Sequence, residues 1–201
     1  MSKMIDGMLH NMENQDGIDL RNGCNNIIIS DITGRTGDDV IALTAIASPN
    51  YRPGGSVRNT HVMHNDWSRR DPTIHDVIIR NVIATSNLCH IIRLLPCNTE
   101  IYNVVIDGII DTCTDSDKHS TVIALGDNDS AYGKNLPNGL HNITISNVIC
   151  NAKRAGIRIL GYLKDSVISN VINKNPKAPT ILATRENGLS NVLISNITPQ
   201  I

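Results

Sequence analysis

A short pattern recurs along the whole chain of 201 residues, and it restricts the possible folds more than any other feature. Each copy has alternating apolar residues, then a polar pair, then one more apolar residue. Alternation with a period of two predicts strands. The copies are NNIIISDIT (25–33), HDVIIRNVI (75–83), YNVVIDGII (102–110), HNITISNVI (141–149), KDSVISNVI (164–172) and LSNVLISNIT (189–198).

A second short apolar segment accompanies these copies, as in DDVIALTAI, HIIRLLP, TVIALGD, AGIRILG and TILAT. Short strands that recur without helical periodicity between them predict an all-β parallel solenoid, in which each repeat is one coil. The number of copies predicts about six to seven coils in a single domain over residues 1–201. A β-sandwich would instead show turn signals about every 8–12 residues, because its strands are short and follow one another closely.

The aligned copies also define which residues should become neighbours. The final apolar positions are Ile32, Val82, Ile109, Val148, Val171 and Ile197. Asn81, Asn147, Asn170 and Asn196 share the preceding position. Because a solenoid stacks equivalent positions at about 4.8 Å, we expect these asparagines to form a ladder of side-chain amide hydrogen bonds.

The amino-acid composition agrees with a strand-rich fold and argues against some classes of binding partner. Aromatic residues make up 2% of the chain, with no Phe, so the core must consist of Ile, Val and Leu. A net charge of −1 favours neither nucleic acid nor an anionic membrane surface as a partner. The chain has neither the apolar run of about 20 residues that a membrane helix needs nor the apolar centre of a signal peptide, so the expected location is the cytoplasm.

Two segments depart from the repeat. Residues 44–72 read as an inserted loop, and its Trp67 offers a stacking face for a sugar. Residues 1–13 read as a cap or as an incomplete first coil. The apolar spacing within them predicts an amphipathic capping turn, with its face formed by Ile5, Met8, Leu9 and Met12. An exposed coil edge at this end predicts a homodimer through the N-terminal end.

Two acidic turns lie one repeat apart. Asp16 occurs in Gln-Asp-Gly, and Asp38 and Asp39 occur in Gly-Asp-Asp, 22 and 23 residues later. Since that interval is one coil, the three carboxylates should converge, and their mutual repulsion should raise at least one pKa. One carboxyl can then act as general acid while another acts as base. We expect the separation of about 6.5–9.5 Å that an inverting glycosidase uses.

The same residues carry a family resemblance. NQDGID resembles the NTDGxD motif of the family 28 glycoside hydrolases, the polygalacturonases and their relatives, and TGDDVIAL resembles their GDDCxAI motif. The resemblance implies a right-handed parallel β-helix that hydrolyses galacturonan-type polysaccharide with inversion. It matches Asp38 to the general acid, Asp16 and Asp39 to the pair that activates water, and Asn14 to the first motif residue. No metal or cofactor is implied.

Two further motifs of that family match only partly. The Gly-His-Gly motif has three candidates without flanking glycines, His61, His64 and His90. The Arg-Ile-Lys motif is best matched by Arg93-Leu94-Leu95, which keeps the arginine and lacks the lysine. Arg93 is therefore either a substrate-binding residue or the ion-pair partner of Asp38 or Asp39. Without the lysine, a neutral or differently substituted sugar is an open alternative to galacturonate.

Two other functions remain open. An inactive or truncated relative would be a carbohydrate-binding or structural β-helix. Its carboxylates would be capped by their own turns or paired to Arg93, whereas a hydrolase needs them to face one groove. A calcium-dependent polysaccharide lyase would use the three carboxylates as ligands and Arg93 as the base. We rank the lyase below the hydrolase, because no further acid obviously completes the ligand set.

Overall fold

The computed structural model describes residues 2–5, 8–11, 15–47, 71–114, 121–129 and 133–198. These residues form fourteen strands and no helix. It follows that, within this part of the chain, there is no helix of the length and apolarity needed to span a membrane.

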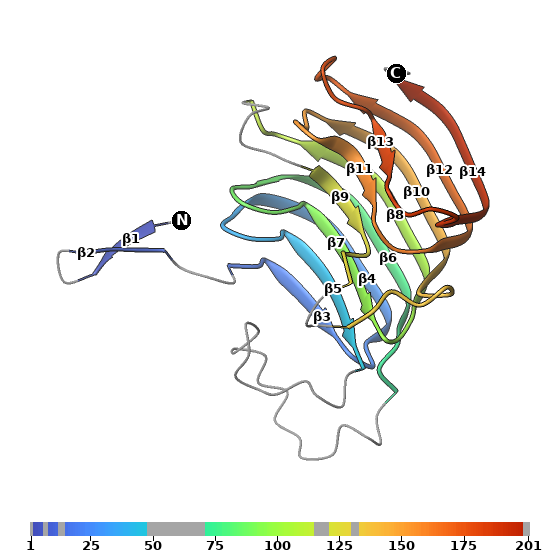
Figure 1. Ribbon diagram of the computed structural model, residues 1–201. Coiled ribbons are helices and arrows are strands. Elements are labelled where there is room, and N and C mark those ends of the chain that lie inside the picture. Colours follow the sequence, from blue (N-terminus) through green and yellow to red (C-terminus); the bar gives the residue numbers. More distant parts are fainter. Residues whose placement is uncertain are drawn as a thin grey trace.

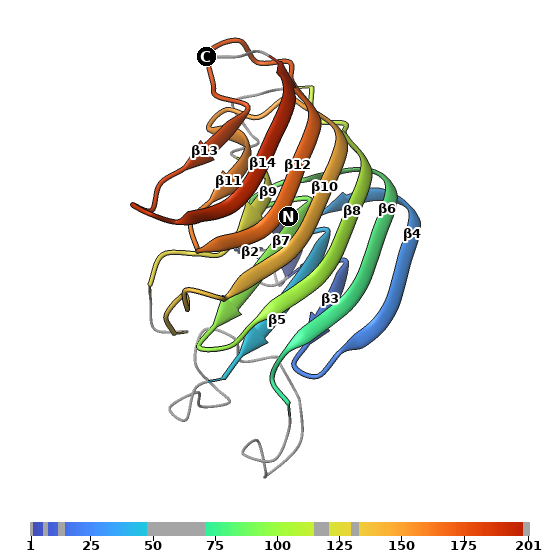
Figure 2. The ribbon, with the colours of Figure 1, turned by 90° about the vertical axis from the view of Figure 1, so that its right-hand side faces the viewer.

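Twelve of the strands form two parallel sheets of six strands each, and the chain visits the two sheets alternately (Figure 1). The short sheet contains β3 (Ile18–Arg21), β5 (Ile41–Ile46), β7 (Ile92–Cys97), β9 (Thr121–Leu125), β11 (Ala155–Ile159) and β13 (Ile181–Ala183). The long sheet contains β4 (Asn25–Thr36), β6 (Ile74–Ser86), β8 (Ile101–Asp111), β10 (Leu140–Cys150), β12 (Leu163–Asn173) and β14 (Leu189–Thr198). Figure 2 shows the long strands side by side in the order of the chain.

The register of the long sheet confirms the alignment of the repeats. Each of the six final apolar positions pairs with its counterpart in the next strand, from Ile32 with Val82 to Val171 with Ile197. The inward side chains of both sheets form one buried cluster of aliphatic residues. The short sheet contributes fully buried side chains from its central strands, Ile41, Leu43, Ile92, Leu94, Ile123 and Leu125.

Each long strand contains a pair of residues with positive φ, five positions apart. Asn, Asp and Gly tolerate this left-handed conformation, in which most other side chains are strained. The pairs are Asn26 and Asp31, Asp76 and Asn81, Asn103 and Gly108, Asn142 and Asn147, Asp165 and Asn170, and Asn191 and Asn196. The recurrence of Asn in the sequence therefore serves the backbone as well as the side-chain ladder.

The expected asparagine ladder is present and has one gap. Asn196 donates to Asn170 (3.0 Å), and Asn170 donates to Asn147 (3.1 Å). The rung between Asn81 and Asn147 is Gly108, which has no amide, so Asn147 donates to Asp107 instead (2.8 Å). The sequence analysis missed a second ladder at the earlier positive-φ position, where Asn142 donates to Asn103 and Asn103 donates to Asp76.

The N-terminal prediction of an amphipathic capping turn is wrong. Strands β1 (Ser2–Ile5) and β2 (Met8–Asn11) pair antiparallel in a sheet of their own. This pairing also differs from an incomplete first coil, whose strands would be parallel. Isolated helices of this length are marginal, and the Asp-Gly dipeptide between the two segments is a strong hairpin signal that the helical spacing concealed.

The inserted loop was expected over residues 44–72, and this predicted start is too early. Strand β5 continues through Thr44 to Ile46 and pairs with Leu95 to Cys97 of β7, so these three residues belong to the sheet. Residues 48–70, which include Trp67, lie outside the described residues.

Candidate active site

The two acidic turns lie next to each other, as their spacing predicts. Asp16 precedes β3, and Asp38 and Asp39 precede β5, the neighbouring strand. The Gly17 N–H donates to the Asp39 carbonyl (2.9 Å), and the Asp38 N–H donates to the Gln15 carbonyl (3.3 Å). A Cβ at Gly17 would lie 2.6 Å from the Val40 carbonyl oxygen, so the glycine of Gln-Asp-Gly permits this close approach.

The three carboxylates converge more tightly than expected. The Asp39 N–H is shared between Asp16 Oδ1 and Asp38 Oδ1, each at 3.0 Å. One oxygen from each of the three residues lies within 4.8 Å of the others. The expected separation of about 6.5–9.5 Å is therefore wrong for these oxygens. The physical reason is the shared N–H, which draws two carboxylates toward one point.

Burial and the neighbouring carboxylates raise the pKa of Asp16 from 3.8 to about 6. Burial contributes most, followed by repulsion from Asp38, Asp39 and Asp19, while the hydrogen bond from the Asp39 N–H acts in the opposite direction. The pKa of Asp19 is also raised by burial, against the opposing charge of Arg21. The prediction that at least one carboxyl of the cluster has a raised pKa is confirmed at Asp16.

Asp39 is the buried member of the cluster, with 3% of its surface exposed. Its Oδ1 lies 2.9 Å from the backbone nitrogen of His90, which donates to it, and 2.8 Å from His90 Nδ1. His90 is therefore the histidine that the described structure brings to the carboxylates. His61 and His64 lie outside the described residues, and so does Asn14.

Arg93 has two acidic partners. Its Nη2 lies 2.6 Å from Asp127 Oδ2, and its Nη1 lies 3.8 Å from Asp39 Oδ2. Burial lowers the pKa of Arg93, but the charges of Asp39 and Asp127 outweigh burial and raise it. The predicted ion pair with Asp39 is confirmed as the longer contact. The sequence analysis missed Asp127, which follows β9 on the next strand of the short sheet.

Cys89 is a second residue that the sequence analysis missed. Its N–H donates to Ser86 Oγ (3.0 Å), and the Ser86 hydroxyl donates to the Asp38 carbonyl (2.7 Å). Burial raises the pKa of the Cys89 thiol, and a hydrogen bond to Asp38 raises it further. The signal that points to it is its place beside His90, just before β7.

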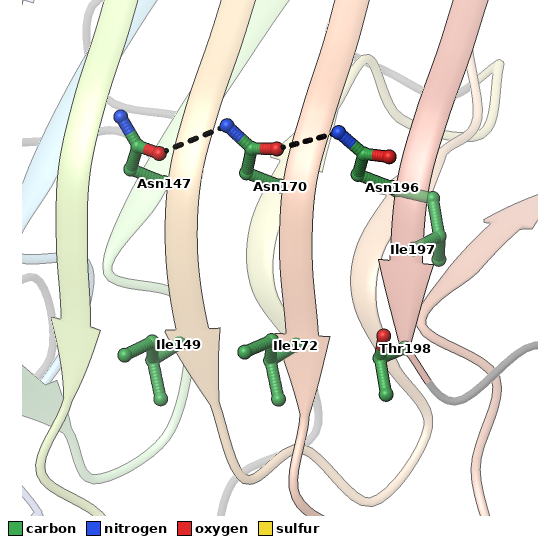
Figure 3. A pocket seen from close by; sticks show the side chains of 7 residues that line it. All are labelled: Asn147, Ile149, Asn170, Ile172, Asn196, Ile197 and Thr198. Carbon is green, nitrogen blue, oxygen red and sulfur yellow. Dashed lines mark hydrogen bonds between the residues drawn. The ribbon is translucent and has the colours of Figure 1, made fainter.

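A shallow groove of about 600 Å³ lies elsewhere, on the long sheet (Figure 3). Its lining combines the ladder residues Asn147, Asn170 and Asn196 with an exposed row of Ile149, Ile172 and Thr198, and with the half-buried Ile197. The ladder amides bond to one another along the groove. The groove is lined by amides, aliphatic side chains and one hydroxyl, with no carboxylate or imidazole, so the acidic cluster is the better candidate for chemistry.

Comparisons of the chain with protein-family models, with curated proteins and with solved structures found no match.

Proposed function

We propose that the protein is a right-handed parallel β-solenoid whose acidic cluster hydrolyses glycosidic bonds in a polysaccharide. The observation that carries this proposal is the convergence of Asp16, Asp38 and Asp39 from two successive repeats, with the pKa of Asp16 raised to about 6. A carboxyl whose pKa is raised toward neutral is better suited to general acid or base catalysis than an ordinary carboxyl. The alternating sheets and their register support the solenoid.

In this mechanism Asp38 donates a proton to the oxygen of the leaving sugar as the bond from that oxygen to the anomeric carbon breaks. A water molecule bound by Asp16 and Asp39 attacks the anomeric carbon and gives its proton to a carboxylate of the cluster. Asp16 is suited to accept that proton, because its raised pKa makes its carboxylate a stronger base than an ordinary one. The shared Asp39 N–H holds Asp16 and Asp38 in place for both transfers.

The test is release of reducing ends from a panel of pectic and neutral polysaccharides by the wild type, Asp38→Asn and Asp165→Asn. Loss of the acid should lower the rate by about 10²–10⁴-fold. Asp165 is a matched control, since it lies on β12 and its carboxylate accepts the Asn191 amide, which an asparagine oxygen can also accept. A wild type without activity on any member, or an Asp38→Asn variant with full activity, would contradict the proposal.

A non-catalytic carbohydrate-binding or structural β-solenoid is the second candidate. The observation in its favour is that the carboxylates already have partners within the protein. Asp38 and Asp16 both accept the Asp39 N–H, Asp38 within its own turn and Asp16 from the preceding repeat, while Asp39 bonds to His90. On this alternative, the panel should show saturable binding of an oligosaccharide by calorimetry and no bond cleavage. Asp38→Asn would then leave the absence of turnover unchanged.

The calcium-dependent lyase is the weakest of the three proposals. It assigns proton abstraction to Arg93, but Arg93 is paired with Asp127 and its pKa is raised, so it gives up its own proton less readily than a free arginine. An unsaturated product formed only with added Ca²⁺ would nevertheless identify a lyase.

A further inference from the structure

We propose that Asp39, Cys89 and His90 form a binding site for a divalent transition-metal ion of the zinc type. These three residues offer oxygen, sulfur and nitrogen donors within 4.8 Å of one another. A tetrahedral zinc ion with bonds of about 2.0–2.3 Å places its donors about 3.5 Å apart. Asp39 Oδ1 and His90 Nδ1 are already 2.8 Å apart, so these two atoms would separate slightly around an ion, and the Cys89 sulfur lies within 4.8 Å of a donor atom of each residue.

The donor types determine which ion fits. Thiolate and imidazole select zinc, cobalt and related ions, whereas calcium and magnesium require oxygen ligands. One sulfur and one nitrogen donor in a set of three therefore exclude a calcium-type site at this position. Asp38 accepts a hydrogen bond from the Cys89 thiol, so its carboxylate is adjacent and can supply the fourth ligand.

The backbone around the donors is already fixed. Asp39 precedes β5 and Cys89 and His90 precede β7, its neighbour in the short sheet. The His90 N–H donates to Asp39 Oδ1 (2.9 Å), and the Cys89 N–H donates to Ser86 Oγ (3.0 Å). An ion would thus bind to side chains whose main chain needs no rearrangement, which lowers the entropic cost of binding.

The local charge favours a cation. Asp16 and Asp38 each place an oxygen within 4.8 Å of an Asp39 oxygen, and the nearby cation Arg93 has its shorter contact with Asp127. A divalent ion would offset the repulsion among the three carboxylates. Binding replaces the Cys89 sulfur–hydrogen bond with a sulfur–metal bond and releases that proton to solvent. If the proposed function holds, the ion takes Asp39 away from the attacking water and inhibits hydrolysis.

The experiment uses the chain of 201 residues, freed of metal by a chelator, and Co²⁺ as a spectroscopic substitute for Zn²⁺. The expected result is one equivalent bound with a thiolate-to-cobalt charge-transfer absorption, which Zn²⁺ abolishes and Ca²⁺ does not. Cys89→Ser should remove this absorption and weaken Zn²⁺ binding at least tenfold in competition with a coloured chelator. Cys97→Ser is the matched control, because Cys97 is a free buried thiol on β7, and it should behave as the wild type.

A wild type that binds no Co²⁺, or binds it without the charge-transfer absorption, would overturn the proposal, and this readout needs no variant. Unchanged binding by Cys89→Ser would also overturn it and would assign the ion to the carboxylates alone. The measurement contains no polysaccharide, so its outcome is independent of whether the cluster hydrolyses glycosidic bonds.

Discussion

At the scale of single residues, Asp39 connects three neighbouring strands of the short sheet. Its N–H binds Asp16 before β3, and its carboxylate accepts the N–H of His90 before β7 and faces Arg93 on β7. A buried carboxylate with so many fixed partners is ordered by the protein itself. The chemistry of the cluster therefore depends on residues that position charge as much as on those that exchange protons.

The raised pKa of Asp16 predicts how stability depends on pH. In the unfolded chain its pKa is near 3.8, and in the folded protein it is about 6. Above pH 6 the carboxylate is charged in both states, and the folded state bears the unfavourable burial and repulsion. As the pH falls from about 6 toward 3.8, the folded state takes up the proton first and this penalty decreases.

Asp16→Asn removes the penalty and keeps an oxygen for the Asp39 N–H. We expect it to raise the free energy of unfolding by about 1 kcal/mol at pH 7.5, after discounting for the solvent around this half-buried group. The gain should shrink to about a third at pH 4.5. Urea denaturation at both values measures it, and an equal gain at each pH would show that Asp16 does not titrate as described.

Arg93→Met tests the ion pairs of the cluster. The substitution keeps a long apolar side chain but leaves Asp39 and Asp127 without their cation, so we expect a loss of about 3 kcal/mol in the free energy of unfolding. Arg158 provides the control, since it lies on the same row of the short sheet, two strands further along, and its buried Nε has no hydrogen-bond partner. Arg158→Met should be nearly neutral. Equal losses for both variants in urea denaturation would show that the Arg93 pairs contribute nothing specific.

At the scale of elements, each long strand repeats the same polar and apolar rows as its neighbours. A further row stacks the rings of His75, Tyr102 and His141, with centroids 4.8 and 4.9 Å apart. These distances equal the spacing between paired strands, so parallel register alone brings like side chains into contact. The gap at Gly108 is the point where the asparagine row loses that continuity.

Filling the gap should stabilise the protein. Gly108 has φ of 70°, which asparagine tolerates, and a Cβ there would be 3.4 Å from Asn81 Oδ1, an ordinary contact. Gly108→Asn should add a rung between Asn81 and Asn147 and raise the free energy of unfolding by about 1 kcal/mol. Gly108→Ala has the strain without the amide and should lower it by about 1 kcal/mol. Thermal unfolding of the two variants and the wild type measures both effects. If Gly108→Ala were as stabilising as Gly108→Asn, the gain would not come from the ladder amide.

At the scale of the whole molecule, equivalent residues of the long sheet form continuous rows from β4 to β14. One row of the long sheet consists entirely of isoleucine, paired from strand to strand as Ile29, Ile79, Ile106, Ile145, Ile168 and Ile194. Its central members are fully buried, while Ile194 is 38% exposed. The same side chain in the same row therefore has a different energetic role at the centre and at the last described strand.

This row allows a matched comparison. Ile106→Ala should lower the free energy of unfolding by about 4 kcal/mol, because it leaves a cavity within packed neighbours. Ile194→Ala should cost about 1 kcal/mol, since water already reaches that side chain. Denaturant unfolding of the pair gives the difference. Equal costs would mean that a further surface covers β14.

The sequence predicted those features that depend on the period alone. The pairing of Ile32 through Ile197 and the meeting of Asp16 with Asp39 follow from counting residues, and both are observed. Asp127 and Cys89 escaped prediction because their contacts depend on side-chain reach across strands, which spacing does not give. The carboxylate separation was wrong because a backbone N–H shared by two acids cannot be read from a motif. The solenoid, its handedness and the activity of the protein stay predictions.

The matching rows have a consequence for how the chain can change in length. Inserting one more repeat between Val148 and Val171 would present compatible rows on both sides, so duplication of a gene segment there would lengthen the stack without disturbing the neighbours. An extra repeat between Asp16 and Asp39 would instead separate these residues by about 4.8 Å more and break their shared hydrogen bond. Descendants of this chain can therefore gain or lose repeats toward the C-terminal strands, but at the acidic cluster the number of repeats is fixed.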